Sequence, residues 1–333
     1  MFPTKYRNFY PGWYKESTDT SGETTYDWMI PMPRISQDFL DCVFYLYDSE
    51  EHAVQGEKIG GCGFLIKISE FVSSKATNSE LKQGESIDHI YAVTNQHNID
   101  NGALVLRVKN KSGCMEFVST NQDQWVRHTE NDDLAICLIS PGARKSWTAL
   151  PTSQLVDKTD HLYEYIGPGD DVFMSGRFVG HDGKEQNAPI VRFGNIASLP
   201  SEPVLVWERD HEQESILIDM RSLSGFSGAP VFVYVNAVPI EEIRAALNKK
   251  KPSVGLIVDE PRLLGIEWGI MTIPDNHQSG LQTTRVQSNS GISAIVAAWK
   301  IYDLLFAENV VEERQLASRQ YIEERGKQVT LLT

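Results

Sequence analysis

Short apolar runs separated by polar and turn residues dominate the chain. The runs are rich in Val, Ile, Phe and Tyr, which favour β-strands. They lie at 41–47, 63–68, 90–94, 104–108, 134–139, 171–179, 190–196, 215–220, 231–235, 254–258 and 263–271. A polar loop at 69–88 and a Pro- and Gly-bearing stretch at 141–169 interrupt the series. This pattern predicts an all-β protein in two halves, with paired β-barrels favoured over an alternating βαβ sheet.

The two ends of the chain depart from this pattern. The start is rich in aromatic residues and Pro without a sustained period, and predicts an irregular arm whose rings lie on the folded body. Near the other end, apolar residues recur at helical spacing and predict a helix from about Ser293, with a polar helical continuation at 312–328. These residues are Ile295, Ala298, Trp299, Tyr302, Leu305 and Phe306. A further short helix is expected at 240–251. The resulting division is an arm at 1–40, a first barrel at 41–150, a second barrel at 151–285 and a C-terminal helical region at 286–333.

Charge and cysteine content narrow the function classes. The chain has 31 Lys and Arg against 45 Asp and Glu, which gives a net charge of −14 at pH 7. Such an acidic surface argues against binding to nucleic acid or to an anionic membrane, since phosphate affinity comes largely from Lys and Arg. No apolar run approaches the ~20 residues that span a bilayer, and the start lacks an apolar signal-peptide stretch. The four cysteines form no C-x-x-C motif and no dense disulfide framework. We expect a soluble, reduced, cytoplasmic protein.

Ser227 is the sharpest candidate for chemistry. It lies in Gly225-Phe226-Ser227-Gly228-Ala229-Pro230, directly before the strand-like run 231–235. A serine nucleophile needs a tight, exposed turn, and glycines let backbone N–H groups approach the developing oxyanion. An ordinary Gly/Ser turn leading into a strand fits the same string. The nucleophile elbow of α/β-hydrolases does not, because an elbow leads into a helix and only His277 follows the serine.

His97 and Asp133 complete a possible set of three. His97 follows the β-like run 90–94 in a short polar turn, and Asp133 stands at the head of the run 134–139. Taken singly, the first fits an ordinary surface or core histidine and the second a strand-edge turn carboxylate. Together with Ser227 they follow the order His, Asp, Ser, which is one of the known orders of the catalytic triad.

Five strings together resemble the trypsin-like (chymotrypsin-fold) serine peptidases. They are Gly61-Cys62-Gly63-Phe64-Leu65, Val93-Thr94-Asn95-Gln96-His97, Asp133-Leu134-Ala135-Ile136, Gly225-Phe226-Ser227-Gly228-Ala229-Pro230 and Leu264-Gly265-Ile266-Glu267-Trp268-Gly269. The resemblance covers roughly Asp41 to Phe306. It implies two antiparallel six-stranded β-barrels with the site in the cleft between them.

The resemblance also implies roles for individual residues. Ser227 would be the nucleophile, His97 the general base and acid, and Asp133, rather than its neighbour Asp132, the group that orients the imidazole. The N–H groups of Gly225 and Ser227 would form the oxyanion hole.

Substrate binding follows from the same resemblance. Glu267, Trp268 and Gly269 would lie on the strand that pairs with the substrate backbone. Arg221, followed by Ser222, would stand at the base of the specificity pocket and favour an acidic side chain. Arg221 could equally turn outward or pair with Asp219.

Three positions depart from the family pattern. Phe226 stands where secreted members carry the aspartate that receives a new N-terminus on activation, so we expect no such activation. Asn98 replaces the cysteine beside the histidine, and Ala229 replaces a glycine. Control would then fall to the aromatic arm or to a regulatory protein partner.

The sequence thus predicts a serine endopeptidase acting on a protein or peptide substrate. No H-E-x-x-H or phosphate-binding motif occurs, so no metal and no cofactor are expected. Two alternatives remain, an inactive peptidase fold that serves as a protein-binding module and an esterase on the same fold.

Overall fold

The computed structural model describes residues 14–18, 24–28, 34–71, 86–130, 132–140, 146–158, 166–178, 183–206, 210–220, 225–235, 261–279 and 282–330. Its contacts divide the chain into two units, Met1–Gln37 and Asp38–Thr333. In the first unit, β1 (Tyr14–Thr18) and β2 (Thr24–Trp28) form an antiparallel ladder. The arm was expected to be irregular, but both segments carry Thr and aromatic residues, which favour extended backbone.

A mixed sheet forms the first half of the second unit. Its strands are β3 (Val43–Tyr47), β4 (Ile59–Phe71), β5 (Ser86–Thr94), β6 (Val105–Lys109), β7 (Met115–Ser119), β8 (Val126–Arg127), β9 (Ala135–Ser140) and β10 (Leu150–Pro151). They follow the order β7-β6-β3-β4-β5-β9-β8, with β10 parallel to β4. Phe44, Leu65, Ile90, Leu106 and Trp125 are among the buried residues that fill its core. We call this part the sheet half.

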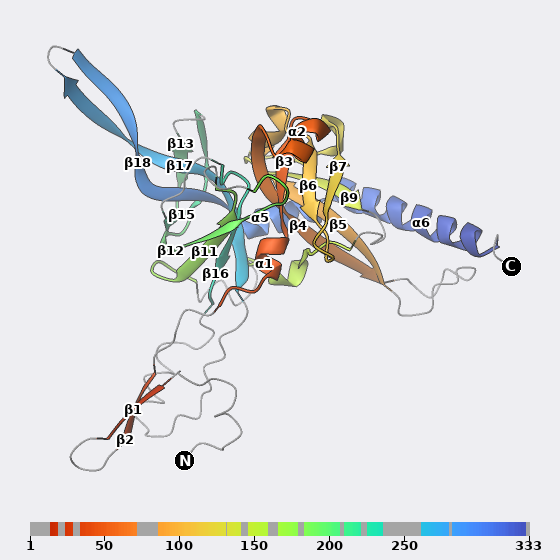
Figure 1. Cartoon of the computed structure of the whole chain (residues 1–333), viewed down its shortest axis with the longest axis horizontal. Helices are drawn as coiled ribbons and strands as arrows, with labels where there is room; N and C mark the ends of the chain where they lie inside the picture. Colours follow the sequence, from red (N-terminus) through yellow and green to blue (C-terminus); the bar gives the residue numbers. More distant parts are fainter. Residues whose placement is uncertain are drawn as a thin grey trace. The chain divides into compact units, whose positions relative to one another are not determined.

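A closed barrel forms the other half, and we call it the barrel half (Figure 1). Around the barrel the strands are β11 (Asp171–Gly176), β12 (Ile190–Ser198), β15 (Ile216–Asp219), β18 (Gln282–Ala297), β17 (Arg262–Ser279) and β16 (Pro230–Val233). Two further strands, β13 (Pro203–Val206) and β14 (His211–Glu214), form a separate ladder. Phe173 of β11 and Phe232 of β16 stack with ring centres 4.9 Å apart, and Phe39 of α1 lies edge-on to Phe232 at 4.7 Å.

Helices are short except at the C-terminal end. They are α1 (Asp38–Asp41), α2 (Glu50–Gln55), α3 (Gln96–Asp100), α5 (Ala298–Leu305) and α6 (Glu308–Thr330). The helix expected from Ser293 begins at Ala298, because residues 293–297 complete β18 against β15 and β17. Residues 286–297 therefore belong to the barrel and not to the helical region. The long polar helix expected near the C-terminus is confirmed as α6. None of the helices described has the length and apolar character needed to cross a membrane.

The predicted fold class is confirmed. A closed six-stranded antiparallel barrel, a second curved sheet and a C-terminal helix make up the chymotrypsin-like fold. The sheet half differs in detail, because its ladder has eight strands and ends at β7 and β8 instead of closing. β8 has only two residues, and the side chains of β7 are half-buried or exposed, as suits edge strands. The expected helix at 240–251 and strand at 254–258 lie outside the described residues.

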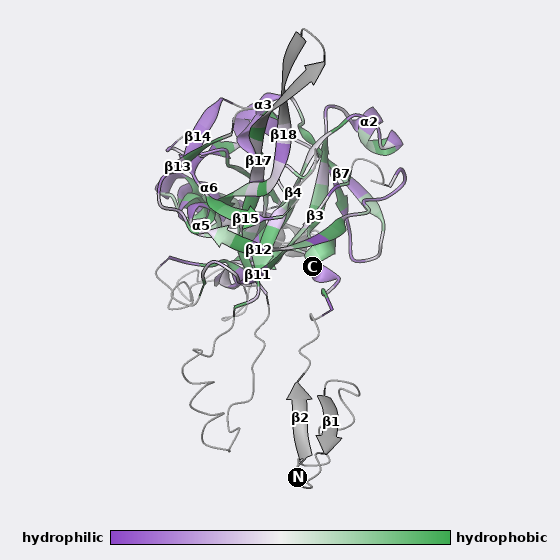
Figure 2. Ribbon diagram, turned by 90° about the vertical axis from the view of Figure 1, so that its left-hand side faces the viewer, coloured by the Kyte–Doolittle hydropathy of each residue, from purple (hydrophilic) through white to green (hydrophobic). Residues whose placement is uncertain are grey.

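Hydropathy follows this architecture. Figure 2 shows hydrophobic residues concentrated on the central strands, whereas β14 and α2 are largely hydrophilic. The two halves are joined by polar contacts, notably at Arg107, whose side chain is buried. Its guanidinium donates to the Asn187 side chain at 2.8 Å and to the Gly183 and Lys184 carbonyls at 3.1 and 2.9 Å. These hydrogen bonds help to hold the sheet half and the barrel half, which carry the candidate residues, against each other.

Candidate active site

His97 and Asp133 are in direct contact. Nδ1 of His97 lies 2.5 Å from Oδ2 of Asp133, and the His97 backbone N–H donates to Oδ1 at 2.9 Å. A carboxylate only accepts hydrogen bonds, so Nδ1 carries the proton and Nε2 keeps its lone pair. The His97 side chain is 22% exposed and that of Asp133 only 8%, so the imidazole is reachable while the carboxylate behind it is shielded. This arrangement gives His97 the tautomer of a general base.

The local structure explains how His97 is presented. Strand β5 ends at Thr94, and α3 starts at Gln96 after Asn95, whose backbone is extended. The Asn95 side chain donates to the Asp133 carbonyl at 2.9 Å, and Thr94 Oγ1 donates to the Cys62 carbonyl at 2.7 Å. One turn of helix directly after a buried strand therefore fixes His97 at the end of the sheet.

The Ser227 loop lies against the sheet half through its backbone. The Ser227 carbonyl accepts from the Cys62 N–H at 3.1 Å and from the Asn98 side chain at 3.3 Å. Gly228 approaches so closely that a Cβ there would lie 1.8 Å from the Cys62 carbonyl oxygen, and its φ is +91°. The predicted nucleophile is thus brought next to the segment that carries His97, and the loop fits only because residue 228 is glycine.

Gly225 and Phe226 complete the turn before the serine. Gly225 has a φ of +101°, in the region that favours glycine. Phe226 is fully buried, and the Arg192 guanidinium carbon lies 5.7 Å from its ring centre. An aromatic ring therefore fills the place expected for an activating aspartate.

The Asn98 side chain links the histidine segment to the Ser227 loop. Its amide donates to Thr94 Oγ1 at 3.1 Å as well as to Ser227, and a Cβ at Gly61 would lie 2.6 Å from the amide group. Hydrogen bonds from Asn98 thus connect the histidine segment to the Ser227 loop.

The predicted substrate-binding residues divide into two groups. Glu267 and Trp268 of β17 have buried side chains, and Trp268 Nε1 donates to Ser215 Oγ at 3.0 Å. Any contact of these two residues with a substrate would be made by their backbone. Glu267 also supports the nucleophile loop, because its N–H donates to the Ala229 carbonyl and its carbonyl accepts from Gly228, both at 2.9 Å. Gly269 lies in the same strand. Arg221 and Ser222 lie outside the described residues.

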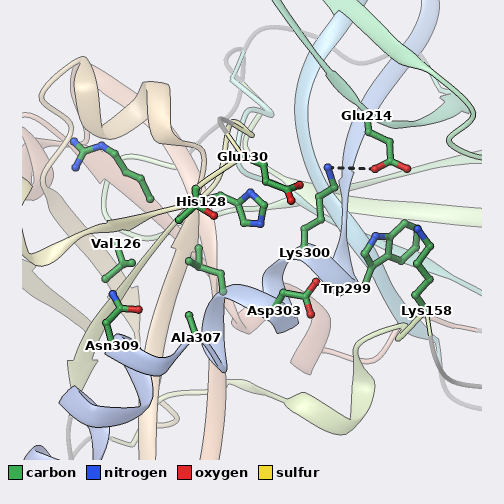
Figure 3. A pocket seen from close by; sticks show the side chains of 13 residues that line it. Val126, His128, Glu130, Lys158, Glu214, Trp299, Lys300, Asp303, Ala307 and Asn309 are labelled. Carbon is green, nitrogen blue, oxygen red and sulfur yellow. Dashed lines mark ion pairs between the residues drawn. The ribbon is translucent and has the colours of Figure 1, made fainter.

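A cluster of polar side chains includes Asp132, the residue that directly precedes Asp133. His128, Glu130 and Asp132 offer ligand atoms within 4.8 Å of one another. The Lys300 ammonium, however, lies 2.8 and 3.0 Å from the two oxygens of Asp132, and a cation there repels a metal ion. These residues do not fit a metal site. His128 and Glu130 line a cavity of about 410 Å³, together with Lys158, Trp299 and Lys300 (Figure 3).

Sequence reasoning missed two residues of this region. Gln213 of β14 is buried, and its Oε1 accepts from the Asp133 N–H at 2.6 Å. Lys300 reaches Asp132 from α5. Neither lies in a recognisable motif, since Gln213 belongs to the polar run His-Glu-Gln-Glu and Lys300 follows an apolar segment.

Comparisons with known proteins add little. No family model and no curated protein matches the chain. Among solved structures, an inactivated protease paralogue of the scabies mite, S-I1, is similar at 12% identity and a TM-score of 0.35. The match covers 68% of this chain and 90% of the mite protein. We therefore argue the function from the geometry of this chain.

Proposed function

We propose that this protein is a serine endopeptidase with Ser227, His97 and Asp133 as its triad. The observation that carries the proposal is the His97–Asp133 contact, in which one carboxylate accepts from both Nδ1 and the backbone N–H of the same histidine. A surface ion pair does not need this second hydrogen bond. The Ser227 loop, whose sequence resembles the nucleophile string of the trypsin-like peptidases, also lies close to His97. The Ser227 carbonyl accepts a hydrogen bond from the side chain of Asn98, the residue after His97.

The residues then divide the reaction into two steps. Ser227 Oγ attacks the carbonyl carbon of the scissile bond while its proton passes to His97 Nε2. The tetrahedral oxyanion accepts hydrogen bonds from the N–H groups of Gly225 and Ser227. As the C–N bond breaks, Nε2 returns the proton to the leaving amine. Water then attacks the acyl-enzyme, with its proton taken by Nε2 and returned to Ser227 Oγ.

Asp133 acts through His97 throughout the cycle. It holds the imidazole in the tautomer that leaves Nε2 free and stabilises the imidazolium formed in each step. Its low exposure strengthens this interaction, because less water screens the two charges.

Covalent labelling tests the proposal. A fluorophosphonate probe should label the wild-type protein at Ser227 and fail to label Ser227→Ala. The matched control is Ser112→Ala, which removes an exposed serine in a turn of the sheet half and should label like the wild type. Peptide hydrolysis should follow the labelling in all three proteins. A wild-type protein that neither labels nor hydrolyses peptides would contradict the proposal and favour the protein-binding alternative. Hydrolysis of simple esters without peptide cleavage would favour an esterase.

A further inference from the structure

Lys300 and Asp132 form a shielded ion pair behind the candidate site. Nζ of Lys300 lies 3.0 Å from Oδ1 and 2.8 Å from Oδ2 of Asp132, and the side chains are 9% and 3% exposed. Lys300 belongs to α5, which follows the last barrel strand directly, whereas Asp132 directly precedes Asp133. The pair therefore connects the end of the barrel half to the residue beside the candidate catalytic carboxylate.

Asp132 is held on its other sides as well. His128 Nδ1 lies 3.0 Å from its Oδ2, and its carbonyl accepts from the Leu134 N–H at 2.7 Å. Burial alone would raise the pKa of Asp132, but hydrogen bonds from His128 and Lys300 outweigh it and lower the pKa below its ordinary value. The turn that contains Asp133 is thus fixed around a charged carboxylate.

A second connection from the barrel half reaches the same turn. Gln213 of β14 accepts from the Asp133 N–H, and the adjacent Glu214 lies 3.5 Å from Lys300 Nζ (Figure 3). Two separate elements, α5 and β14, therefore contact consecutive residues of the sheet half. Groups carried by the other half of the molecule therefore hold the chain at Asp132 and Asp133.

Stability alone does not account for such a pair. Burying two charges costs desolvation free energy, and an apolar pair of similar size is often as stabilising or more so. An ion pair with two short contacts differs in being directional, so it fixes where Asp132 lies. We propose that Lys300 and Asp132 are positioning residues that hold the Asp133 carboxylate in place against His97. This inference rests on the proposed peptidase function, and its consequence is that catalysis depends on the docking of α5.

Lys300→Met tests the proposal, because methionine keeps much of the length of lysine and removes the charge. We expect kcat to fall about 10- to 100-fold with KM changed less than about twofold, since small misplacements of catalytic groups carry penalties of this size. Lys158→Met is the matched control. Lys158 borders the same cavity, with Nζ 5.6 Å from the Trp299 ring centre, and its removal should leave both constants unchanged. A wild-type kcat in folded Lys300→Met would overturn the proposal.

Two further variants separate positioning from stability. Lys300→Arg keeps the cation and should recover part of kcat. The double variant Asp132→Asn/Lys300→Met removes both charges, so its thermal stability should recover relative to Lys300→Met while kcat stays low. If kcat recovers together with the melting temperature, the pair is only structural and the proposal is wrong.

A spectroscopic readout makes the test independent of turnover. The short Nδ1–H···Oδ2 hydrogen bond of His97 should give a strongly deshielded proton resonance, assigned by its loss in His97→Gln. We expect this resonance in the wild type and in Lys158→Met, and its loss or upfield shift in Lys300→Met. An unchanged resonance in Lys300→Met would overturn the positioning role. An inactive wild-type protein would contradict the proposed function, and the resonance would still report on the positioning of Asp133.

Discussion

The two halves hold their parts of the candidate site by different means. In the sheet half, polar groups hold Asp133 and His97: Asn95 and the carboxylate itself belong to this half, and Gln213 contacts Asp133 from β14 of the barrel half. In the barrel half, the Ser227 loop is held mainly by backbone hydrogen bonds and by the close approach of Gly228 to Cys62. The sheet half fixes the position of a charged side chain, and the barrel half fixes the backbone path of the Ser227 loop.

This difference follows from what each part would have to do. A carboxylate that stabilises an imidazolium must be oriented within a shielded setting, which requires directional partners. A loop that presents N–H groups to an oxyanion needs a particular backbone path, and glycine allows it. We therefore expect the sheet half to be sensitive to changes of polarity and the barrel half to changes of volume.

Asp133→Asn should give the largest effect. The amide is close in shape to the carboxylate, but its NH₂ group can donate to the imidazole and favour the wrong tautomer of His97. We expect kcat for peptide hydrolysis to fall about 10³- to 10⁴-fold with a small change in melting temperature. Asp123→Asn, at an exposed position of the same half, is the control and should keep wild-type kinetics. A fall of less than about tenfold would show that orientation by Asp133 is not the main polar requirement.

Gly228→Ala tests the barrel half by adding one methyl group at a position of positive φ. Alanine at a φ of +91° costs about 1–2 kcal/mol, and the clash of its Cβ with Cys62 adds about 1–3 kcal/mol. The free energy of unfolding, measured in urea, should fall by the sum of the two effects, and probe labelling of Ser227 should be lost.

Gly113→Ala provides the matched control for the close approach. Gly113 has a φ of +86°, yet a Cβ added there would have no atom within 4 Å outside its two chain neighbours. Only the backbone cost should appear there. Equal losses at the two glycines would show that close packing against Cys62 does not hold the nucleophile loop.

The sequence pointed to the candidate residues more readily than to the residues that support them. His97, Asp133 and the Ser227 turn are recognisable because the catalytic roles proposed for them need particular residue types in a particular order. The central strands are recognisable because they are buried and apolar. β14 was missed because all four of its residues are polar, although Gln213 is buried. The Lys300–Asp132 pair joins residues 168 positions apart, and no local pattern encodes a contact of that separation.

Helix α6 also contacts the sheet half, at a site that can titrate. His89 of β5 is fully buried, and its Nε2 lies 2.7 Å from Ser318 Oγ of α6. Burial lowers the pKa of His89, opposed by the nearby carboxylates of Glu70 and Asp88 and aided by the charge of Arg314. The histidine is therefore harder to protonate in the folded protein than in the unfolded chain.

The smallest expected effect is the pH dependence of this α6 contact. Because the folded pKa of His89 lies below the unfolded value of about 6.5, its contribution to stability is complete above that pH and is lost as the pH falls below it. Between pH 6.5 and 5.5 the loss in unfolding free energy is at most about 1 kcal/mol. His89→Gln should show a shallower decline than the wild type over this range. Urea unfolding at several pH values measures both. Parallel curves of unfolding free energy against pH for His89→Gln and wild type would show that the polar contact of His89, which lies away from Asp133, does not set the stability of the sheet half.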